Sequence, residues 1–294
     1  MQQAGQIVSQ NLTRGLALTG LAFAMFTVQD AMVKWLVVVY SVPQVLFMRS
    51  VVIIAMALML SGRQALPRLV ASRNKGALVL RAALLLIAWL LYYTASRDLG
   101  LAQLSTIYFV APIIVVALSA LILHERVPLA RWLIVILGFL GVLLASLPSA
   151  SISLLPAAMA LLAAFCWALN SILVRLISGS ETTANQMLAS NALFLIASAV
   201  TFPWVWQTPE AFDWMLMFAL GLVGGLGQFW FFEGFRHAPA SAIAPMEYTA
   251  LVWAFLLGYL IWSDIPQVNV FAGAGLIAAS SLWLLWSERQ RAPA

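Results

Sequence analysis

Ten apolar runs fill nearly the whole chain, and they constrain its fold more than any other feature. A helix that crosses the hydrocarbon core of a bilayer needs roughly 20 mainly apolar residues. In lipid the backbone must satisfy its own hydrogen bonds, so such segments are helical. The sequence therefore predicts an all-α integral membrane protein with ten transmembrane helices, near residues 15–38, 44–61, 76–95, 102–123, 130–147, 154–175, 185–204, 214–235, 240–262 and 268–286.

The composition excludes a water-soluble globular protein. Of the 294 residues, 64% are hydrophobic and 9% are charged, whereas soluble domains carry about 25% charged residues. The single cysteine, Cys166, cannot form an intrachain disulfide. The connectors between runs are too short to hold a separate soluble domain. The net charge of +5 falls mainly between the runs, which is typical of membrane orientation rather than of nucleic-acid binding.

The basic residues predict the orientation. If the N-terminus is inside, the external loops hold only Arg97, and the remaining loop bases are cytoplasmic. The positive-inside rule then places both termini in the cytoplasm. The eleven cytoplasmic bases are Arg14, Arg63, Arg68, Arg73, Lys75, Arg126, Arg131, Arg175, Arg236, Arg289 and Arg291.

The two halves of the chain resemble each other. Residues 21–34, LAFAMFTVQDAMVK, align without a gap with residues 162–175, LAAFCWALNSILVR. Chance similarity between hydrophobic helices is the alternative, but the polar positions also stay in register. Because five spans is an odd number, the second copy must be inverted, as in many secondary transporters. We predict two inverted five-helix repeats, residues 1–149 and 150–294.

Residues 91–132, LYYTASRDLGLAQLSTIYFVAPIIVVALSALILHERVPLARW, resemble the EamA domain of the drug/metabolite transporter superfamily. The resemblance is carried by the aromatic end of the third run, the small residues opening the fourth, Pro112 within it, and the turn with Glu125. Gly138 and Gly141 follow in the fifth run.

A second copy of this domain covers about 154–286, with Ser263-Asp264 where a Glu is typical and Ala250 at the position of Pro112. Within the superfamily the chain is most similar to ten-helix aromatic amino-acid exporters of the YddG type.

The resemblance implies a secondary transporter that exports amino acids, aromatic or otherwise neutral, from a bacterial cytoplasm across the inner membrane. Alternating access would occur at a central cavity bordered by spans one, three, four, six, eight and nine. Another metabolite, such as a nucleoside or an S-adenosylmethionine-like compound, is an alternative, and protons are an open choice of coupling ion. No cofactor, metal or nucleic-acid partner is expected, and a monomer is compatible with this architecture.

Ionisable residues within the runs are candidates for function, because charges at membrane depth are costly and usually face a cavity or a partner. Asp30 and Lys34 are four residues apart and share one helix face. Arg49 enters its run from the same external side. This cluster forms part of an outer gate or binds a substrate carboxylate. The alternative is an ion-pair network that fixes the first two helices.

Glu247 has no basic residue near it in sequence. It lies about two turns into the ninth run, where Arg81 of the third run is a potential partner from the same side. A buried carboxylate needs a partner or a proton. Glu247 is therefore a candidate for a proton site, a cation site or a contact to a substrate amine, and Arg81 is a gate or ion-pair candidate.

Polar and aromatic residues supply further candidates for a cavity wall. Aromatic rings with one polar atom suit a mostly apolar metabolite with polar ends, although aromatic residues also gather at membrane interfaces. The candidates are Trp89, Tyr93, Tyr108, Trp167, Asn170 and Gln228.

Other classes of protein lack their signatures. His124 and His237 are isolated in turns, and no metalloprotease motif, nucleophile elbow or phosphate-binding loop occurs. A channel usually needs a repeated filter or rings of like charge. The run GLVGGLG at 221–227 lacks a preceding strand, so we interpret it as a close helix-packing surface rather than a nucleotide loop.

Overall fold

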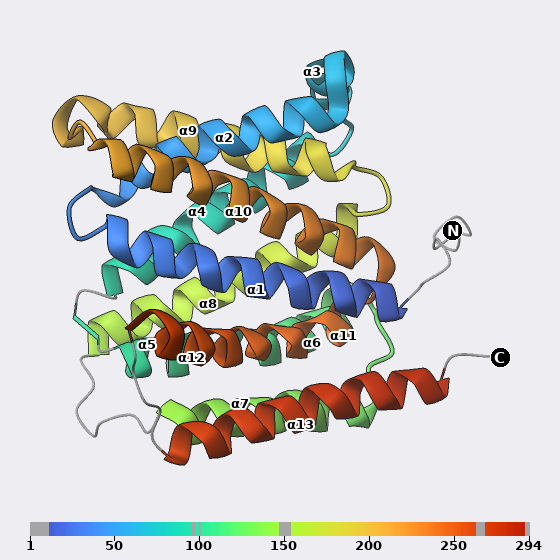
Figure 1. The fold of residues 1–294 in the computed structure, drawn as a ribbon. Helices are drawn as coiled ribbons and strands as arrows, with labels where there is room; N and C mark the ends of the chain where they lie inside the picture. Colours follow the sequence, from blue (N-terminus) through green and yellow to red (C-terminus); the bar gives the residue numbers. More distant parts are fainter. Residues whose placement is uncertain (1–11, 96–97, 100, 147–153, 263–267, 292–294) are drawn as a thin grey trace.

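The computed structural model describes residues 12–95, 98–99, 101–146, 154–262 and 268–291 (Figure 1). Every regular element in these ranges is a helix. The predicted boundary between the halves at residue 149, and the second-copy turn at 263–266, lie outside the described residues.

Ten apolar helical spans account for the described chain, as predicted. Seven are long enough to cross a membrane, and three shorter apolar helices lie at 106–122, 129–145 and 268–284. In the first half the helices are α1 (Leu12–Leu36), α2 (Val42–Ser61), α4 (Lys75–Ala95), α5 (Leu101–Tyr108), α6 (Ala111–Ile122) and α7 (Leu129–Ser146). In the second half they are α8 (Leu154–Ile177), α9 (Thr183–Val205), α10 (Ala211–His237), α11 (Ala240–Ile243), the 3-10 segment η2 (Ala244–Tyr248), α12 (Thr249–Trp262) and α13 (Val268–Arg291).

The fourth and ninth spans are both interrupted. The fourth divides into α5 and α6 just before Pro112, and the ninth divides at η2, whose first turn contains Pro245. Proline lacks an N–H and its ring clashes with the preceding turn, so it favours a break at each place. The ninth run was expected as one span over 240–262, with Ala250 at the position of Pro112 and Glu247 about two turns in. The span is instead interrupted at Pro245, and Glu247 lies in the 3-10 segment.

One short helix was not predicted. The 3-10 turn η1 (Gly62–Gln64) leads into α3 (Ala65–Ala71), between α2 and α4. Leu66 and Val70 of α3 are exposed and four residues apart, so they share one helix face. A helix that lies along the membrane interface has an apolar face of this kind.

The two helix boundaries around the first turn of each half are related by one offset. α8 ends at Ile177, 141 residues after the end of α1 at Leu36, and α9 begins 141 residues after α2. Even the helix caps match. Ser41 and Thr182 have φ, ψ of −68°, 146° and −72°, 151°, and each accepts from the amide three residues on. The offset is that of the alignment between residues 21–34 and 162–175.

The packing repeats as well. α1 packs against α10 as α8 packs against α4, and α1 meets α12 as α8 meets α6. In two further pairs, α2 with α9 and α7 with α13, a helix of one half packs against the helix that corresponds to it in the other half. The members of each pair lie side by side in Figure 1. A twofold axis in the membrane plane that relates the two halves produces this pattern. The prediction of two inverted repeats is confirmed.

α1 begins and α13 ends at the same end of the bundle (Figure 1), which is called the termini end below. The opposite end, where α1 ends, is called the far end.

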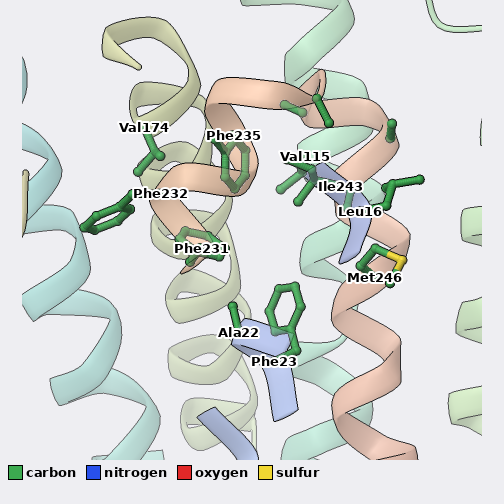
Figure 2. Packing of buried hydrophobic residues seen from close by; sticks show 14 of the residues in the cluster. Leu16, Ala22, Phe23, Val115, Val174, Phe231, Phe232, Phe235, Ile243 and Met246 are labelled. Atoms are coloured by element: carbon green, nitrogen blue, oxygen red, sulfur yellow. The ribbon is translucent and has the colours of Figure 1, made fainter. Parts of the chain in front are cut away.

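α10 carries the glycine run, and it packs closely on α1 and α2. A Cβ on Gly225 would lie 2.6 Å from Met56 Sδ, and a Cβ on Gly227 would lie 2.8 Å from a ring carbon of Phe26. The predicted role in close helix packing is confirmed. Toward the termini end, Leu16, Phe235, Ile243 and Met246 belong to one buried cluster (Figure 2), which fills the space between α1, α10 and the ninth span.

Candidate functional site

A cavity of about 640 Å³ lies between the two halves. Side chains from the spans predicted to border it, namely one, three, four, six, eight and nine, all contribute, and α2 adds Arg49. Its volume falls within the usual range of small-molecule sites, about 300–1,000 Å³. A site at the seam between repeats is the position that alternating access requires.

The structure brings the predicted wall residues together around this cavity. Lys34 also lines it, whereas Arg81 is not among its lining residues. The candidates that line it are Asp30, Arg49, Trp89, Tyr93, Tyr108, Trp167, Asn170, Gln228 and Glu247. That these residues bind a substrate stays a prediction.

Arg49 is the buried cation of the wall. Its side chain is 1% exposed, its Nε donates to Gln29 Oε1 at 2.8 Å, and its guanidinium lies 5.0 Å from the ring centre of Trp89. Within the described residues Arg49 Nη1 has no hydrogen-bond partner. A buried donor left without a partner is costly. Because a guanidinium presents parallel N–H groups, this position suits a carboxylate.

A glycine makes room for this arrangement. A Cβ on Gly224 of α10 would lie 2.9 Å from Arg49 Nε and would collide with Gln29. The glycine run therefore does more than pack helices, since it lets Arg49 and Gln29 lie against the α10 backbone. Substituting Gly224 would displace both side chains.

Asp30 and Lys34 lie on the cavity side of α1, and both are solvent-accessible within it. Asp30 interacts with the Gln29 amide and with the charge of Arg49. Gln29 thus links the carboxylate to the guanidinium. The predicted pairing of Asp30 with Lys34 stays a prediction, but their shared location in the cavity fits it.

Glu247 lies on the wall contributed by η2. It is 5% exposed, and Trp167 Nε1 donates to its Oε2 at 3.0 Å. The suggested partner Arg81 lies elsewhere, where it donates to Gln186 O and Ser190 Oγ. The pairing of Arg81 with Glu247 is therefore not found in the described part of the chain. Glu247 is a buried carboxylate whose contact here is a neutral donor.

Aromatic rings form much of the remaining wall. Trp89 and Tyr93 lie 5.4 Å apart between ring centres, and Tyr92 and Tyr108 lie 4.9 Å apart. Trp167 lies 5.4 Å from Phe231. The sequence reasoning missed Tyr92, Gln29 and Phe231 as lining residues. Gln29 had a signal, because it aligns with the candidate Asn170.

The cavity reaches toward the far end of the bundle. Lys34 and Val37 near the end of α1, and Val270 near the start of α13, belong to its lining. The termini end is closed by packing instead. A Cβ on Gly15 of α1 would lie 2.6 Å from Ala238 Cβ, so these two segments are in contact.

A polar network holds this closed end. Glu125 accepts from Ala240 N at 2.9 Å, Ser241 N at 3.1 Å and Ser241 Oγ at 2.7 Å. Arg175 Nε lies 3.9 Å from Glu125 Oε1. Arg175 also donates to Phe235 O at 2.6 Å. Glu125, which the sequence singled out only through a family resemblance, thus connects three spans at the termini end.

The backbone conformation of the preceding residue orients Glu125 toward these partners. His124 has a φ of 52°, in the left-handed region that non-glycine residues seldom adopt. This turn ends α6 and directs the next side chain toward the first amides of α11.

Inverted five-span repeats with a cavity at their seam are the architecture of secondary transporters. The EamA-like transporter family matches the chain twice, over residues 13–147 and 154–286. The chain belongs to the EamA-like transporter family.

Several curated relatives are similar over long stretches. The pseudopaline exporter CntI of Pseudomonas aeruginosa is 29% identical over 285 residues, 93% of this chain and 96% of the exporter. An S-adenosylmethionine uptake transporter of Rickettsia conorii is 26% identical over 186 residues, 63% of each chain. A riboflavin transporter of Vibrio cholerae is 26% identical over 204 residues, 69% of this chain and 67% of that one.

A solved crystal structure also shares the fold. It superimposes with a TM-score of 0.75 at 19% sequence identity, covering 97% of this chain and 100% of the other. At this identity the likeness concerns the fold alone.

Proposed function

We propose that the protein exports small zwitterionic metabolites, in the first place amino acids with aromatic or other neutral side chains. The observation that carries this proposal is the pairing of unlike charges across an aromatic cavity. Arg49 offers an unsatisfied donor to a carboxylate, while Asp30 and Glu247 offer carboxylates to an ammonium group. The rings of Trp89 and Tyr108 suit the apolar body between the two charges.

We propose the orientation of the protein in the membrane from its basic residues. Arg14, Arg73, Lys75, Arg126 and Arg236 lie at or near helix ends that belong to the termini end, and basic residues favour the cytoplasmic side. The termini end is therefore cytoplasmic in this proposal, and the membrane is the bacterial inner membrane. The cavity then reaches toward the outside, so the structure corresponds to the state from which an exporter releases its substrate.

The relatives support a metabolite transporter but differ in solute and direction. An exporter of pseudopaline and uptake transporters for S-adenosylmethionine and riboflavin are all similar to this chain. An S-adenosylmethionine-like compound is the second candidate, since it combines an amino acid group with a ring system that the aromatic wall would fit.

Counterflow in liposomes tests the proposal. Purified protein is reconstituted with unlabelled L-phenylalanine, L-leucine, S-adenosylmethionine or riboflavin inside, and uptake of each labelled compound is followed. Saturable uptake stimulated by the same compound inside supports a carrier for it. Amino acids that give no counterflow, while riboflavin or S-adenosylmethionine does, would overturn the amino-acid assignment. An ohmic current would indicate a channel, and chemical conversion of the compound an enzyme.

We propose that Glu247 carries the proton if transport is coupled to one. It is buried, and its neighbours Trp167, Tyr108 and Tyr248 carry no positive charge. Burial without a cation partner disfavours the charged form of a carboxyl group, so such a group can hold a proton. Glu247→Gln should make counterflow independent of pH while the protein still inserts and folds. An unchanged pH response in this variant would remove the role, and Glu233→Gln at the cytoplasmic end serves as the control.

A further inference from the structure

A second guanidinium is buried outside the cavity. Arg81 of α4 is 0% exposed, and it lies six residues into the helix, about 9 Å along its axis. Its Nη2 donates to Gln186 O at 2.6 Å and to Ser190 Oγ at 2.5 Å, both on α9. Its Cζ lies 4.6 Å from the ring centre of Phe232.

Several buried polar atoms of Arg81 and of α9 have no hydrogen-bond partner among the described residues. In the described part of the chain, Arg81 Nε and Nη1 have no hydrogen-bond partner, and neither do the side-chain oxygen and nitrogen of Gln186. Asn191 donates to Gln228 Oε1 at 2.9 Å, but its own Oδ1 has no partner. The partners that Arg81 does have are neutral. A buried guanidinium whose partners are all neutral is costly at membrane depth.

Arg81 occupies the place that the twofold axis assigns to Arg49. With the offset of 141 residues that relates α2 to α9, Arg49 corresponds to Ser190, and Ser190 is bound by Arg81. The ring beside each guanidinium comes from equivalent spans, with Trp89 on the third span and Phe232 on the eighth. The position is therefore repeated, although the cation comes from α4 instead of α9.

In an inverted-repeat transporter the two halves exchange conformations between the two open states. A group that is buried behind the cavity in one state becomes part of the cavity wall in the other. We propose that Arg81, with Gln186 and Ser190, forms a second binding site for an anionic group, a carboxylate of the substrate, in the state that opens to the cytoplasm. This inference rests on the proposed alternating access.

Two side chains separate the cavity from the Arg81 site. Phe232 and Gln228 both line the cavity; the Phe232 ring also lies beside Arg81, and Gln228 accepts a hydrogen bond from Asn191. Movement of these two side chains would connect the cavity with the Arg81 site. A substrate carboxylate would then pass from Arg81 to Arg49 on its way out, and each guanidinium would gain the acceptor that it lacks in this structure.

A charge-selective labelling experiment tests the site without knowledge of the substrate. In a Cys166→Ser background, Gln186→Cys places a thiol beside Arg81, whose bond to the Gln186 backbone is retained. Everted membrane vesicles are treated with an anionic sulfonatoethyl or a cationic trimethylammonioethyl methanethiosulfonate. Rates are normalised to those with free 2-mercaptoethanol. We expect the anionic reagent to react about tenfold faster or more.

Arg81 itself is then varied. Arg81→Gln should abolish the preference for the anionic reagent, and Arg81→Lys should keep it because the charge remains. Equal normalised rates in the Arg81 background would overturn the anion site. If the thiol does not react from the cytoplasmic face while the protein still shows counterflow, the Arg81 site is not on the substrate path. That result would not contradict the proposed transport function. Absence of counterflow would instead count against the proposed function.

Sided kinetics give a second readout. For a compound that shows counterflow, Arg81→Gln should raise the half-saturating concentration at the cytoplasmic face about tenfold or more and change it less than twofold at the external face. Arg81→Lys should recover part of this loss. Equal losses at both faces would indicate a merely structural role. Size-exclusion profiles of the variants establish that they fold.

Discussion

The Arg49 and Arg81 sites are equivalent by the internal twofold relation, yet their surroundings differ. Arg49 lines a cavity, shares Gln29 with Asp30, and has a carboxylate in electrostatic range. Arg81 is sealed, and it contacts a backbone carbonyl, a hydroxyl and a ring. The two halves are therefore related in sequence and packing but differ in conformation. In this conformation the Arg49 position faces the cavity, and the equivalent Arg81 position is buried.

The turns between the paired helices extend the comparison. Tyr40, at the far end, donates to Asp213 Oδ2 at 2.5 Å. The residue 141 positions later is Glu181, at the termini end, which accepts from Ser72 Oγ at 2.5 Å and Asn74 Nδ2 at 3.0 Å. Each connects the turn between the first two helices of one half to the start of the third span of the other half, α10 for Tyr40 and α4 for Glu181. The geometry is repeated, but a phenol serves at one end and a carboxylate at the other.

The largest effect is expected at Arg49. Arg49→Gln removes the charge that a carboxylate would bind, and it leaves Lys34 as the cation that shares the cavity with Asp30. Loss of charged hydrogen bonds costs about 1.5–3 kcal/mol, so affinity at the external face should fall roughly 10- to 100-fold. Arg49→Lys keeps the charge but not the planar guanidinium, so its affinity should lie between those of the wild type and Arg49→Gln. Sided counterflow measures both variants, and equal losses at the two faces would erase the contrast with Arg81.

Trp89 should show a smaller effect at the same face. Trp89→Ala removes the ring beside Arg49, and cation–π contacts contribute about 0.5–2 kcal/mol. We expect affinity to fall about tenfold, with Trp89→Phe close to wild type because a ring remains. Tyr108→Ala should weaken affinity by a similar or smaller factor. Wild-type kinetics in both alanine variants would show that the cavity wall is assigned wrongly.

Glu125 tests the closed termini end. Glu125→Gln loses the charge opposite Arg175 and weakens the cap on α11. A loss of about 1 kcal/mol would raise the population open to the cytoplasm roughly fivefold. The labelling rate of Gln186→Cys from that face reports this population. Glu233→Gln, at the same end, is the matched control. A slower rate in Glu125→Gln would mean that the network opens the protein rather than closing it.

The fold was largely predictable because its signals are local. Apolar runs and charged loops determine the spans, and the alignment of 21–34 with 162–175 identified the inverted halves. The break at Pro245 was missed because the comparison looked for a proline at residue 250, whereas an interruption needs only a proline nearby. α3 was missed because it is too short to show a clear periodicity.

The site was predictable in composition but not in pairing. Polar residues in apolar runs indicate a cavity, and the candidates chosen on that ground do surround one. Which of them meet depends on how the helices are rotated. The sequence does not show which side of a mainly apolar helix faces the cavity. Gln186, Ser190 and Asn191 are polar residues of the seventh run that the sequence reasoning did not select, and Arg81 bonds to the first two of them instead of to Glu247.

The smallest expected effect is on stability at acidic pH, and it should distinguish the Glu181 turn from the Tyr40 turn. Burial alone would raise the pKa of the Glu181 carboxyl, but hydrogen bonds from Ser72, Asn185 and Asn74 outweigh it and hold the pKa below its ordinary value of 4.5. A group with a depressed pKa stabilises the folded state above its unfolded pKa, and this contribution is lost as the pH falls through the folded value. The tie at the termini end should therefore be intact at neutral pH and weaken below about pH 4.5.

Thermal unfolding in detergent between pH 7 and pH 3.5 measures this difference. The wild-type midpoint should fall by a few degrees on acidification, while Glu181→Gln should start lower at pH 7 and lose less. Tyr40→Phe removes the equivalent tie at the far end but leaves Glu181 in place, so it should lower the midpoint at pH 7 and keep the acid-dependent loss. If Glu181→Gln and the wild type lose the same amount, the acid sensitivity arises elsewhere, and the two turns differ in chemistry without differing in response.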